Sequence, residues 1–123
     1  MRLRVRVCVF VCVADPTAYH EDQIAVLSDV AVVIQCHASG SGPVLWQIKH
    51  YWEQNAIDVY DGEKIIGDYE GRCSVDGTLH DLTIHQPKVS DTGEYWCIEK
   101  GGFGTKHITQ LYVTGNVIFW HRN

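Results

Sequence analysis

The chain has 123 residues, which is enough for one domain with its own core, and its formal net charge is -5. The ten Lys and Arg residues are scattered along the sequence, so no basic surface for DNA or RNA is indicated. No stretch has a sustained 3.6-residue apolar period, and short β-type runs separated by turns fill the chain. These features predict a single all-β domain.

The first residues have the order of a secretory signal peptide. A positively charged start and a short apolar stretch lead to a small-x-small motif at residues 12–14, so we predict a signal peptide over residues 1–14. The alternating Arg and Val residues at the start also fit an edge strand, which stays open as the alternative. Cleavage would remove Cys8 and Cys12 and leave three cysteines, an odd number that predicts one disulfide and one free thiol.

The domain is expected to cover residues 15–115, followed by a tail at residues 116–123 whose apolar part is too short to cross a membrane. In chain order, strands are expected at residues 31–37, 48–53, 57–60, 72–75, 79–84, 93–99 and 107–113. A glycine-rich loop at residues 100–104 joins the last two. With these seven among them, we expect eight or nine short strands in all, which indicates a β-sandwich of two sheets.

One constellation identifies the sandwich. Cys36 and Cys97 have sixty residues between them, with tryptophans in the interval and Tyr95 two positions before the second cysteine. A sandwich of this kind buries a disulfide between its sheets, packs an indole against it and anchors the following corner with a tyrosine hydroxyl. Trp46 and Trp52 compete for the indole position. Because the Gly-Pro-rich loop fits better before the strand, we expect Trp52 in the core and Trp46 in the loop.

The segment from Asp91 to Cys97, together with Gly71-Arg72, resembles the V-set of immunoglobulin domains. The resemblance, which covers residues 23–114, implies a V-type immunoglobulin-like β-sandwich of two antiparallel sheets with Greek-key connections. It also implies an ion pair between Arg72 and Asp91.

Two further runs point to a subfamily. Residues 95–101, with His50-Tyr51-Trp52, resemble the polymeric immunoglobulin receptor and leukocyte mono-immunoglobulin-like receptors. Those receptors carry a cysteine directly after the strand tryptophan, where this chain has Glu53, and this weakens any ligand carried over from them. Residues 103–105 resemble part of an antigen-receptor joining segment, so a non-rearranged variable-type receptor is an alternative.

Strand alternation assigns the faces. With Tyr95 and Cys97 inward, Trp96 and Ile98 point outward; with Trp52 inward, Tyr51 and Glu53 point outward. The V-set resemblance marks this GFCC′ face as a common ligand surface. The expected ligand-binding residues on it and in the adjoining loop are Tyr51, Glu53, Trp96, Ile98, Lys100 and Phe103. The alternatives are a Trp96 covered by a neighbouring loop or a homodimer partner, and a loop that is only a flexible hairpin.

Cysteine and histidine residues outside this surface also need an interpretation. Alternation turns Cys73 inward, where an inert thiol is expected. The same alternation would bury His80 unless the strand bulges, and the sequence does not decide between these. The seven histidines have no metal-ligand spacing, and no nucleophile, base or paired-carboxylate arrangement has a physical context, so we expect no metal, no cofactor and no enzyme activity.

These inferences favour an immune-type receptor domain that is extracellular, either secreted or the ectodomain of a membrane receptor. Its expected partner is a protein ligand or a lipid headgroup, bound through the exposed face. A homophilic cell-adhesion module, which would form a homodimer through the same face, is the alternative.

Overall fold

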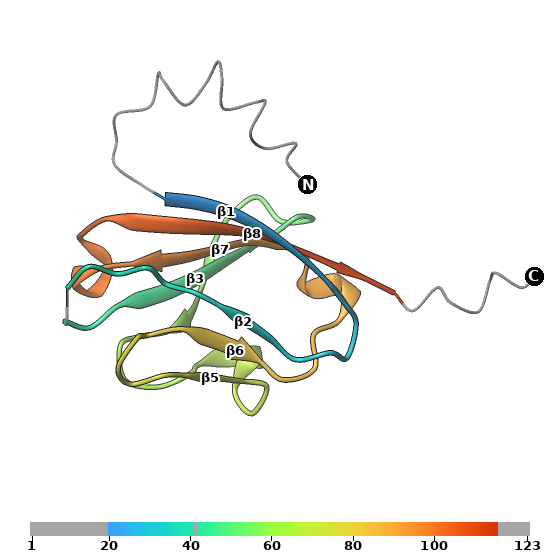
Figure 1. The fold of residues 1–123 in the computed structure, drawn as a ribbon, viewed down its shortest axis with the longest axis horizontal. Helices are drawn as coiled ribbons and strands as arrows, with labels where there is room; N and C mark the ends of the chain where they lie inside the picture. The colour runs from blue at the N-terminus through green and yellow to red at the C-terminus, as the bar shows by residue number, and fades with distance from the viewer. Residues whose placement is uncertain (1–19, 41, 116–123) are drawn as a thin grey trace, which may run out of the picture.

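The computed structural model describes residues 20–40 and 42–115 (Figure 1), so the predicted signal peptide and tail lie outside the described residues. Within these residues the strands are β1 (His20–Leu27), β2 (Val32–Ile34), β3 (Leu45–His50), β4 (Ile57–Tyr60), β5 (Cys73–Val75), β6 (Leu82–Ile84), β7 (Gly93–Ile98) and β8 (Lys106–Thr114). Three short 3-10 turns join some of them: η2 (Gly67–Tyr69), η3 (Val89–Asp91) and η4 (Lys100–Gly102). The predicted all-β class is confirmed.

The strands form two sheets, of order β1-β8-β7-β3-β4 and β2-β6-β5. All pairs are antiparallel except one, since β1 runs parallel to β8 along its whole length (Figure 1). The expectation of two antiparallel sheets is therefore wrong for the larger sheet, which is mixed. A parallel pair needs a long crossover, and here the six strands between β1 and β8 supply it.

Alternating burial explains why these segments form strands. The six residues of β3 alternate between half-buried and buried, and β8 alternates in the same way from Lys106 to Leu111. This period of two gives each strand one apolar side, and the two sheets bury these sides against each other. The core therefore lies between the sheets and holds the disulfide.

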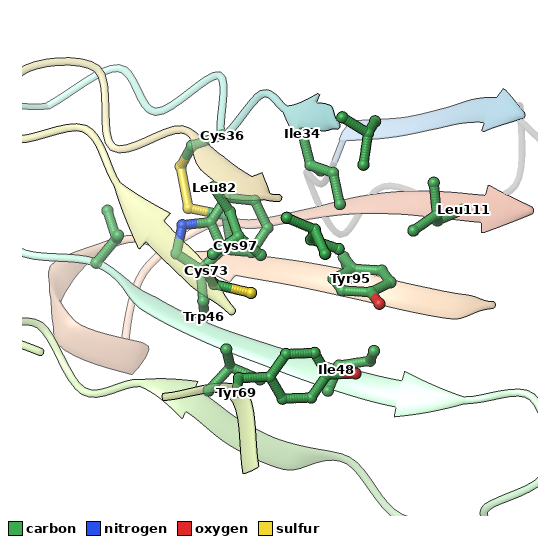
Figure 2. Close-up of a cluster of buried hydrophobic side chains, with 14 of the residues drawn as sticks. Ile34, Cys36, Trp46, Ile48, Tyr69, Cys73, Leu82, Tyr95, Cys97 and Leu111 are labelled. Atoms are coloured by element: carbon green, nitrogen blue, oxygen red, sulfur yellow. A yellow bond between two sulfur atoms is a disulfide. The ribbon is translucent and has the colours of Figure 1, made fainter. Parts of the chain in front are cut away.

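The tryptophan assignment from the sequence is wrong. Trp46 is 1% exposed and lies opposite Cys97 in the β3–β7 register, whereas Trp52 is 56% exposed. Figure 2 shows the Trp46 ring and the disulfide together in the core. The reason is that β3 begins at Leu45, three residues earlier than predicted, so Trp52 falls beyond its end. The Trp46 indole N–H is satisfied by the carbonyl of His80 at 2.8 Å.

The predicted disulfide between Cys36 and Cys97 is confirmed, with 5.4 Å between the two Cα atoms. Cys73 is the free cysteine of the described residues and is buried, as alternation suggested. Burial away from water raises the pKa of its thiol to about 12, because the thiolate is poorly solvated there. This thiol is therefore unreactive at neutral pH.

The corner between β6 and β7 is tied by one carboxylate. Arg72 Nη2 donates to Asp91 Oδ2 at 2.6 Å, so the pair implied by the resemblance is formed, and the backbone N–H of Lys88 donates to the same oxygen at 2.8 Å. The hydroxyl of Tyr95 donates to the Asp91 carbonyl at 2.6 Å. These bonds fix η3 against the strand that carries Cys97.

His80 lies in a turn and not in a strand. Strand β6 begins only at Leu82, and His80 has a positive φ of 65°, so the alternation that seemed to bury it ends before it. The carboxylate of Asp76 holds this turn by accepting the backbone N–H groups of Thr78 (3.0 Å) and Leu79. Leu79 is accordingly 64% exposed.

Candidate interaction surface

The five-stranded sheet turns one face to the core and the other away from it, and we call the second the outer face. Residues that alternate with the buried ones supply its side chains. They are Leu45, Gln47 and Lys49 on β3, Glu94, Trp96 and Ile98 on β7, Lys106, Ile108, Gln110 and Tyr112 on β8, and Glu21, Gln23, Ala25 and Leu27 on β1. Both signs of charge are mixed with apolar and amide groups, a composition typical of reversible protein contacts.

Trp96 occupies the centre of the outer face. In the register it lies between Gln47 on β3 and Ile108 on β8. The ammonium of Lys106 lies 3.9 Å from the centroid of the indole ring, a cation–π contact. The indole N–H donates to Glu94 Oε1 at 2.9 Å. Trp96 is consequently held in one orientation and is half-buried, with its own neighbours covering part of it.

The other carboxylate oxygen of Glu94 accepts a hydrogen bond from Gln110 Nε2 at 3.0 Å. On the far side of Trp96, Gln47 Nε2 donates to Asp58 Oδ1 at 2.7 Å, which extends the bonded surface to β4. Side chains on this face are thus linked in two groups, one between β7 and β8 and one between β3 and β4. Such a surface is pre-organised, and a partner that binds it loses little freedom of these side chains.

Tyr51 and Trp52 form an exposed aromatic turn directly after β3. Tyr51 is 64% exposed, and its backbone N–H donates to the Thr92 carbonyl at 3.1 Å. The Trp52 indole N–H donates to the Ser90 carbonyl at 3.3 Å, and its ring stacks on the imidazole of His50 at 4.8 Å between centroids. The turn therefore lies at the end of the sheet next to η3.

A buried polar network supports this turn from below. His50 is 7% exposed; its Nδ1 lies 2.6 Å from Glu53 Oε1 and its Nε2 lies 2.8 Å from the Tyr69 hydroxyl. The Tyr69 hydroxyl lies 3.0 Å from Asp91 Oδ1, whose other oxygen binds Arg72. Burial, and then the charge of Asp91, raise the pKa of Tyr69, so its phenol stays protonated.

Close packing of β7 against β3 brings these groups together. A side chain on Gly93 would place its Cβ 2.8 Å from the Cα of His50, closer than atoms approach. Only glycine therefore allows β7 to begin here, directly beside the network.

The opposite end of the outer face carries the loop after β7, built around Glu99. Glu99 Oε2 lies 2.6 Å from His107 Nε2 and accepts the backbone N–H of Ser39 at 3.2 Å. The hydrogen bond from His107 lowers the pKa of Glu99 below its ordinary value, although burial acts in the opposite direction. The sequence reasoning missed this pair. Its signal was a carboxylate directly after β7, which continues the inward parity of Tyr95 and Cys97, and an imidazole at an inward position of β8.

The loop displays Phe103, which is 93% exposed. Its backbone is hydrogen-bonded: the N–H groups of Gly102 and Gly104 donate to the Glu99 carbonyl at 3.1 and 2.7 Å, and that of Gly101 donates to the Pro43 carbonyl at 2.9 Å. These bonds give the loop a defined backbone conformation, and its flexibility stays a prediction. A bonded loop that exposes one large aromatic ring resembles a binding anchor.

The structure separates the six residues predicted to bind a ligand into three places. Trp96 lies at the centre of the outer face, Lys100 and Phe103 lie in the loop at one end, and Tyr51 lies in the turn at the other. Ile98 is 8% exposed, so the prediction of an exposed Ile98 is wrong.

Glu53 also differs from expectation. It lies beyond the end of β3, and its carboxylate turns back to His50, so its side chain does not extend the outer face. The prediction placed Glu53 on the outer face because the strand was expected to continue to residue 53, whereas β3 ends at His50.

Residues 20–40 and 42–115 hold no group of three or more His, Cys, Asp or Glu side chains arranged to bind a metal ion. In the same ranges no helix is long and apolar enough to cross a bilayer.

No protein family description and no curated protein matches the chain. Solved structures do match. The CD2-binding domain of CD58 (lymphocyte function-associated antigen 3) has a TM-score of 0.56 at 22% identity, and the match covers 76% of this chain. It covers 53% of the CD58 chain, so this chain spans about half of that structure.

The extracellular domains of the voltage-gated sodium channel beta4 subunit, described as parallel homodimers that explain a role in cell-cell adhesion, have a TM-score of 0.58 at 13% identity. That match covers 78% of this chain and 92% of the other. A second structure of sodium channel beta subunits, described in terms of multimeric cell-adhesive interactions, has a TM-score of 0.58 at 13% identity over 76% of this chain and 92% of its own. Together with the disulfide and the two sheets, these likenesses define an immunoglobulin-like β-sandwich.

Proposed function

We propose that this chain is a V-type recognition domain of an extracellular, immune-type receptor that binds a protein ligand through the outer face. The observation that carries the proposal is Trp96, a tryptophan held by Glu94 and Lys106 at the centre of the outer face of the five-stranded sheet. Tryptophan at the centre of an interface is the residue type that most often dominates binding energy.

Two further observations support this assignment. The disulfide is typical of oxidising compartments, which favours a secreted or cell-surface location. One similar structure is described as the CD2-binding domain of CD58, a domain that binds another protein. None of the three similar structures is described as an enzyme or as binding lipid, so we favour a protein ligand and no catalysis.

The contact region that we propose centres on Trp96 and extends to Tyr51 at one end and to Lys100 and Phe103 at the other. The strand β4, beside β3, widens the larger sheet to five strands, which agrees with the V-type. The subfamily of the polymeric immunoglobulin receptor stays a proposal that rests on the sequence runs at residues 50–52 and 95–101.

The test is a binding screen of the refolded domain against purified extracellular domains and against vesicles of phosphatidylcholine with phosphatidylserine. Each hit is repeated with Trp96→Ala and with the matched control Leu79→Ala, because Leu79 is 64% exposed in the turn before β6, on the other sheet. We expect affinity to fall by about 2 kcal/mol or more for Trp96→Ala and to stay unchanged for the control. Protein ligands whose affinity is unchanged by Trp96→Ala would refute the outer face as the binding site. Binding to vesicles and to no protein would refute a protein ligand.

A homophilic adhesion module is the second candidate, favoured by the parallel homodimers of the beta4 structure. Analytical ultracentrifugation separates the two. A dimer that dissociates on Trp96→Ala but not on Leu79→Ala favours adhesion, whereas a monomer at all concentrations favours a different protein as ligand.

A further inference from the structure

The ammonium of Lys106 lies over the central tryptophan of the outer face without an acceptor of its own. Its nitrogen is 3.9 Å from the centroid of the Trp96 ring, and among the residues that the structure describes it forms no hydrogen bond and no ion pair. On the outer face Lys106 lies opposite Ile98 and is followed by Ile108, so its neighbours in the sheet are apolar. The donors of this ammonium are therefore left for water or for a binding partner.

The other half-buried Lys and Arg residues of the described ranges are bonded within the domain. Lys49 Nζ donates to the Glu53 carbonyl at 2.9 Å, and Arg72 Nη2 pairs with Asp91 Oδ2 at 2.6 Å. The remaining lysines, all exposed, are Lys64, Lys88 and Lys100. Lys106 differs from both groups because it is half-buried and its ammonium contacts only an aromatic ring.

The carboxylate on the neighbouring strand does not neutralise Lys106. Glu94 Oε1 accepts the indole N–H of Trp96 at 2.9 Å, and Glu94 Oε2 accepts a hydrogen bond from Gln110 Nε2 at 3.0 Å. Both oxygens are thus occupied by neutral donors. The positive charge over the indole stays unpaired in the isolated domain.

A partner that covers Trp96 also covers this charge. It removes water from the ammonium, because the ammonium lies on the ring that the partner contacts. Burying a cation without a counter-charge costs more free energy than a cation–π contact returns. A carboxylate placed against Lys106 offsets this cost, because it supplies the opposite charge and accepts the free N–H groups.

We propose that the protein ligand of the outer face presents an Asp or Glu side chain that pairs with Lys106 above the Trp96 ring. This inference rests on the proposed function and names the chemistry of the partner. Trp96 supplies the apolar contact and Lys106 supplies selectivity. A partner with an apolar group at this point is rejected, because its binding leaves the cation buried and unpaired.

The charges of the outer face favour a carboxylate of a protein over an anionic membrane. Membrane surfaces attract clusters of several Lys and Arg residues, each of which adds to the attraction. Here the second lysine of the face, Lys49, is bonded to the Glu53 carbonyl, and the face also carries the carboxylates of Glu94 and Glu21. One unpaired cation beside two carboxylates fits a single acidic side chain.

The test uses a phage-displayed library of random twelve-residue peptides as the probe, selected on the immobilised native chain and on four variants. Lys106→Met keeps an unbranched side chain over the indole and removes the charge. Lys106→Arg keeps a cation that can lie on an aromatic ring. Trp96→Ala removes the ring itself. Lys64→Met is the matched control, because it removes the same charge from an exposed position after β4.

Peptides selected on the native chain, on Lys106→Arg and on Lys64→Met should be enriched in Asp and Glu, whereas those selected on Lys106→Met should not. Synthetic copies of the enriched peptides should bind Lys106→Met about tenfold more weakly than the native chain and Lys64→Met, as expected for a partly buried charge pair that loses one partner. A native selection without acidic enrichment, including one that yields no binding peptide, would overturn the proposal. Equal enrichment on Lys106→Met would overturn it too.

The Trp96→Ala arm separates this inference from the proposed function. Peptides that lose affinity on Trp96→Ala but show no acidic preference would keep the outer face as the site and remove the carboxylate. Acidic peptides that need Lys106 but not Trp96 would disprove the joint anchor. For a protein found in the binding screen, Lys106→Glu should abolish binding, and changing the facing acidic residue of that protein to lysine should restore it. If the domain binds a second copy of itself, a dimer that is unaffected by Lys106→Met would contradict the pairing.

Discussion

The two tryptophans Trp46 and Trp52 give a matched test of how β3 is positioned. They have the same side chain and are an even number of residues apart, so a single strand would turn both to the same face. Their exposures differ, at 1% for Trp46 and 56% for Trp52. Replacing each by alanine in turn therefore compares a core position with a surface position in one fold.

The structure sets the expected magnitudes. Truncating a buried tryptophan costs about 3 to 5 kcal/mol of unfolding free energy, and the His80 carbonyl that Trp46 satisfies adds about 1 kcal/mol when it loses its donor. Trp52→Ala loses partial burial and the stacking on His50, which together are worth about 1 kcal/mol. Because domains of this size are stable by about 5 to 15 kcal/mol in total, Trp46→Ala brings the protein close to unfolding.

Urea unfolding followed by far-ultraviolet circular dichroism measures both costs, with Trp46→Phe as a milder change if Trp46→Ala does not fold. In the folded state, acrylamide should quench the tryptophan fluorescence of Trp52→Phe less than that of Trp46→Phe. The variant Trp46→Phe keeps the exposed indole of Trp52, whereas Trp52→Phe keeps the buried indole of Trp46. A larger loss of stability from Trp52→Ala than from Trp46→Ala would show that β3 begins further along the chain and would refute the register described above.

Three further predictions follow from the core and the loop. Replacing Cys36 and Cys97 together by alanine should lower the unfolding free energy by about 4 kcal/mol, from the loop entropy of a link across 61 positions, as measured by urea unfolding with and without reductant; a loss below about 1 kcal/mol would contradict this. Cys73 should resist iodoacetamide at pH 8 in the folded state and react in urea, as mass spectrometry would show, since burial raises the pKa of its thiol. The pKa of Glu99 is lowered, so its ionised form stabilises the fold above the ordinary carboxyl pKa, and this contribution is lost as the pH falls from about 5 through the lowered value. The unfolding free energy of Glu99→Gln should therefore depend less on pH in that range. A pH dependence equal to that of the native protein would refute the role of the Glu99–His107 pair.

The local pattern of the sequence was sufficient for the class of fold and for which side of β7 is buried. The positions of Cys36, Tyr95 and Cys97 predicted the disulfide and the parity of β7. Period-two alternation is a local property, so it can be read without knowing what a strand pairs with.

Register and strand ends could not be predicted in this way. Trp46 and Trp52 share a parity, so alternation alone cannot tell which one lies opposite Cys97; the pairing of β3 with β7 decides. In the sequence analysis the Gly-Pro-rich loop was expected to delay the strand, but β3 begins at Leu45, two residues after Pro43. The parallel pairing of β1 with β8 is likewise set by contacts between the two ends of the chain.

The same shift of β3 explains why the candidate surface changed while its centre did not. Moving the strand by three residues leaves Trp96 on the outer face, because its position depends on β7 alone, but it releases Tyr51 and Glu53 from the sheet. Glu53 can then turn inward and pair with the imidazole of His50. If the strand continued to residue 53, the Glu53 carboxylate would point outward and could not reach His50. The contact between Glu53 and His50 under the aromatic turn therefore depends on β3 ending at His50, so the tryptophan comparison, which tests where β3 lies, also tests the basis of this contact.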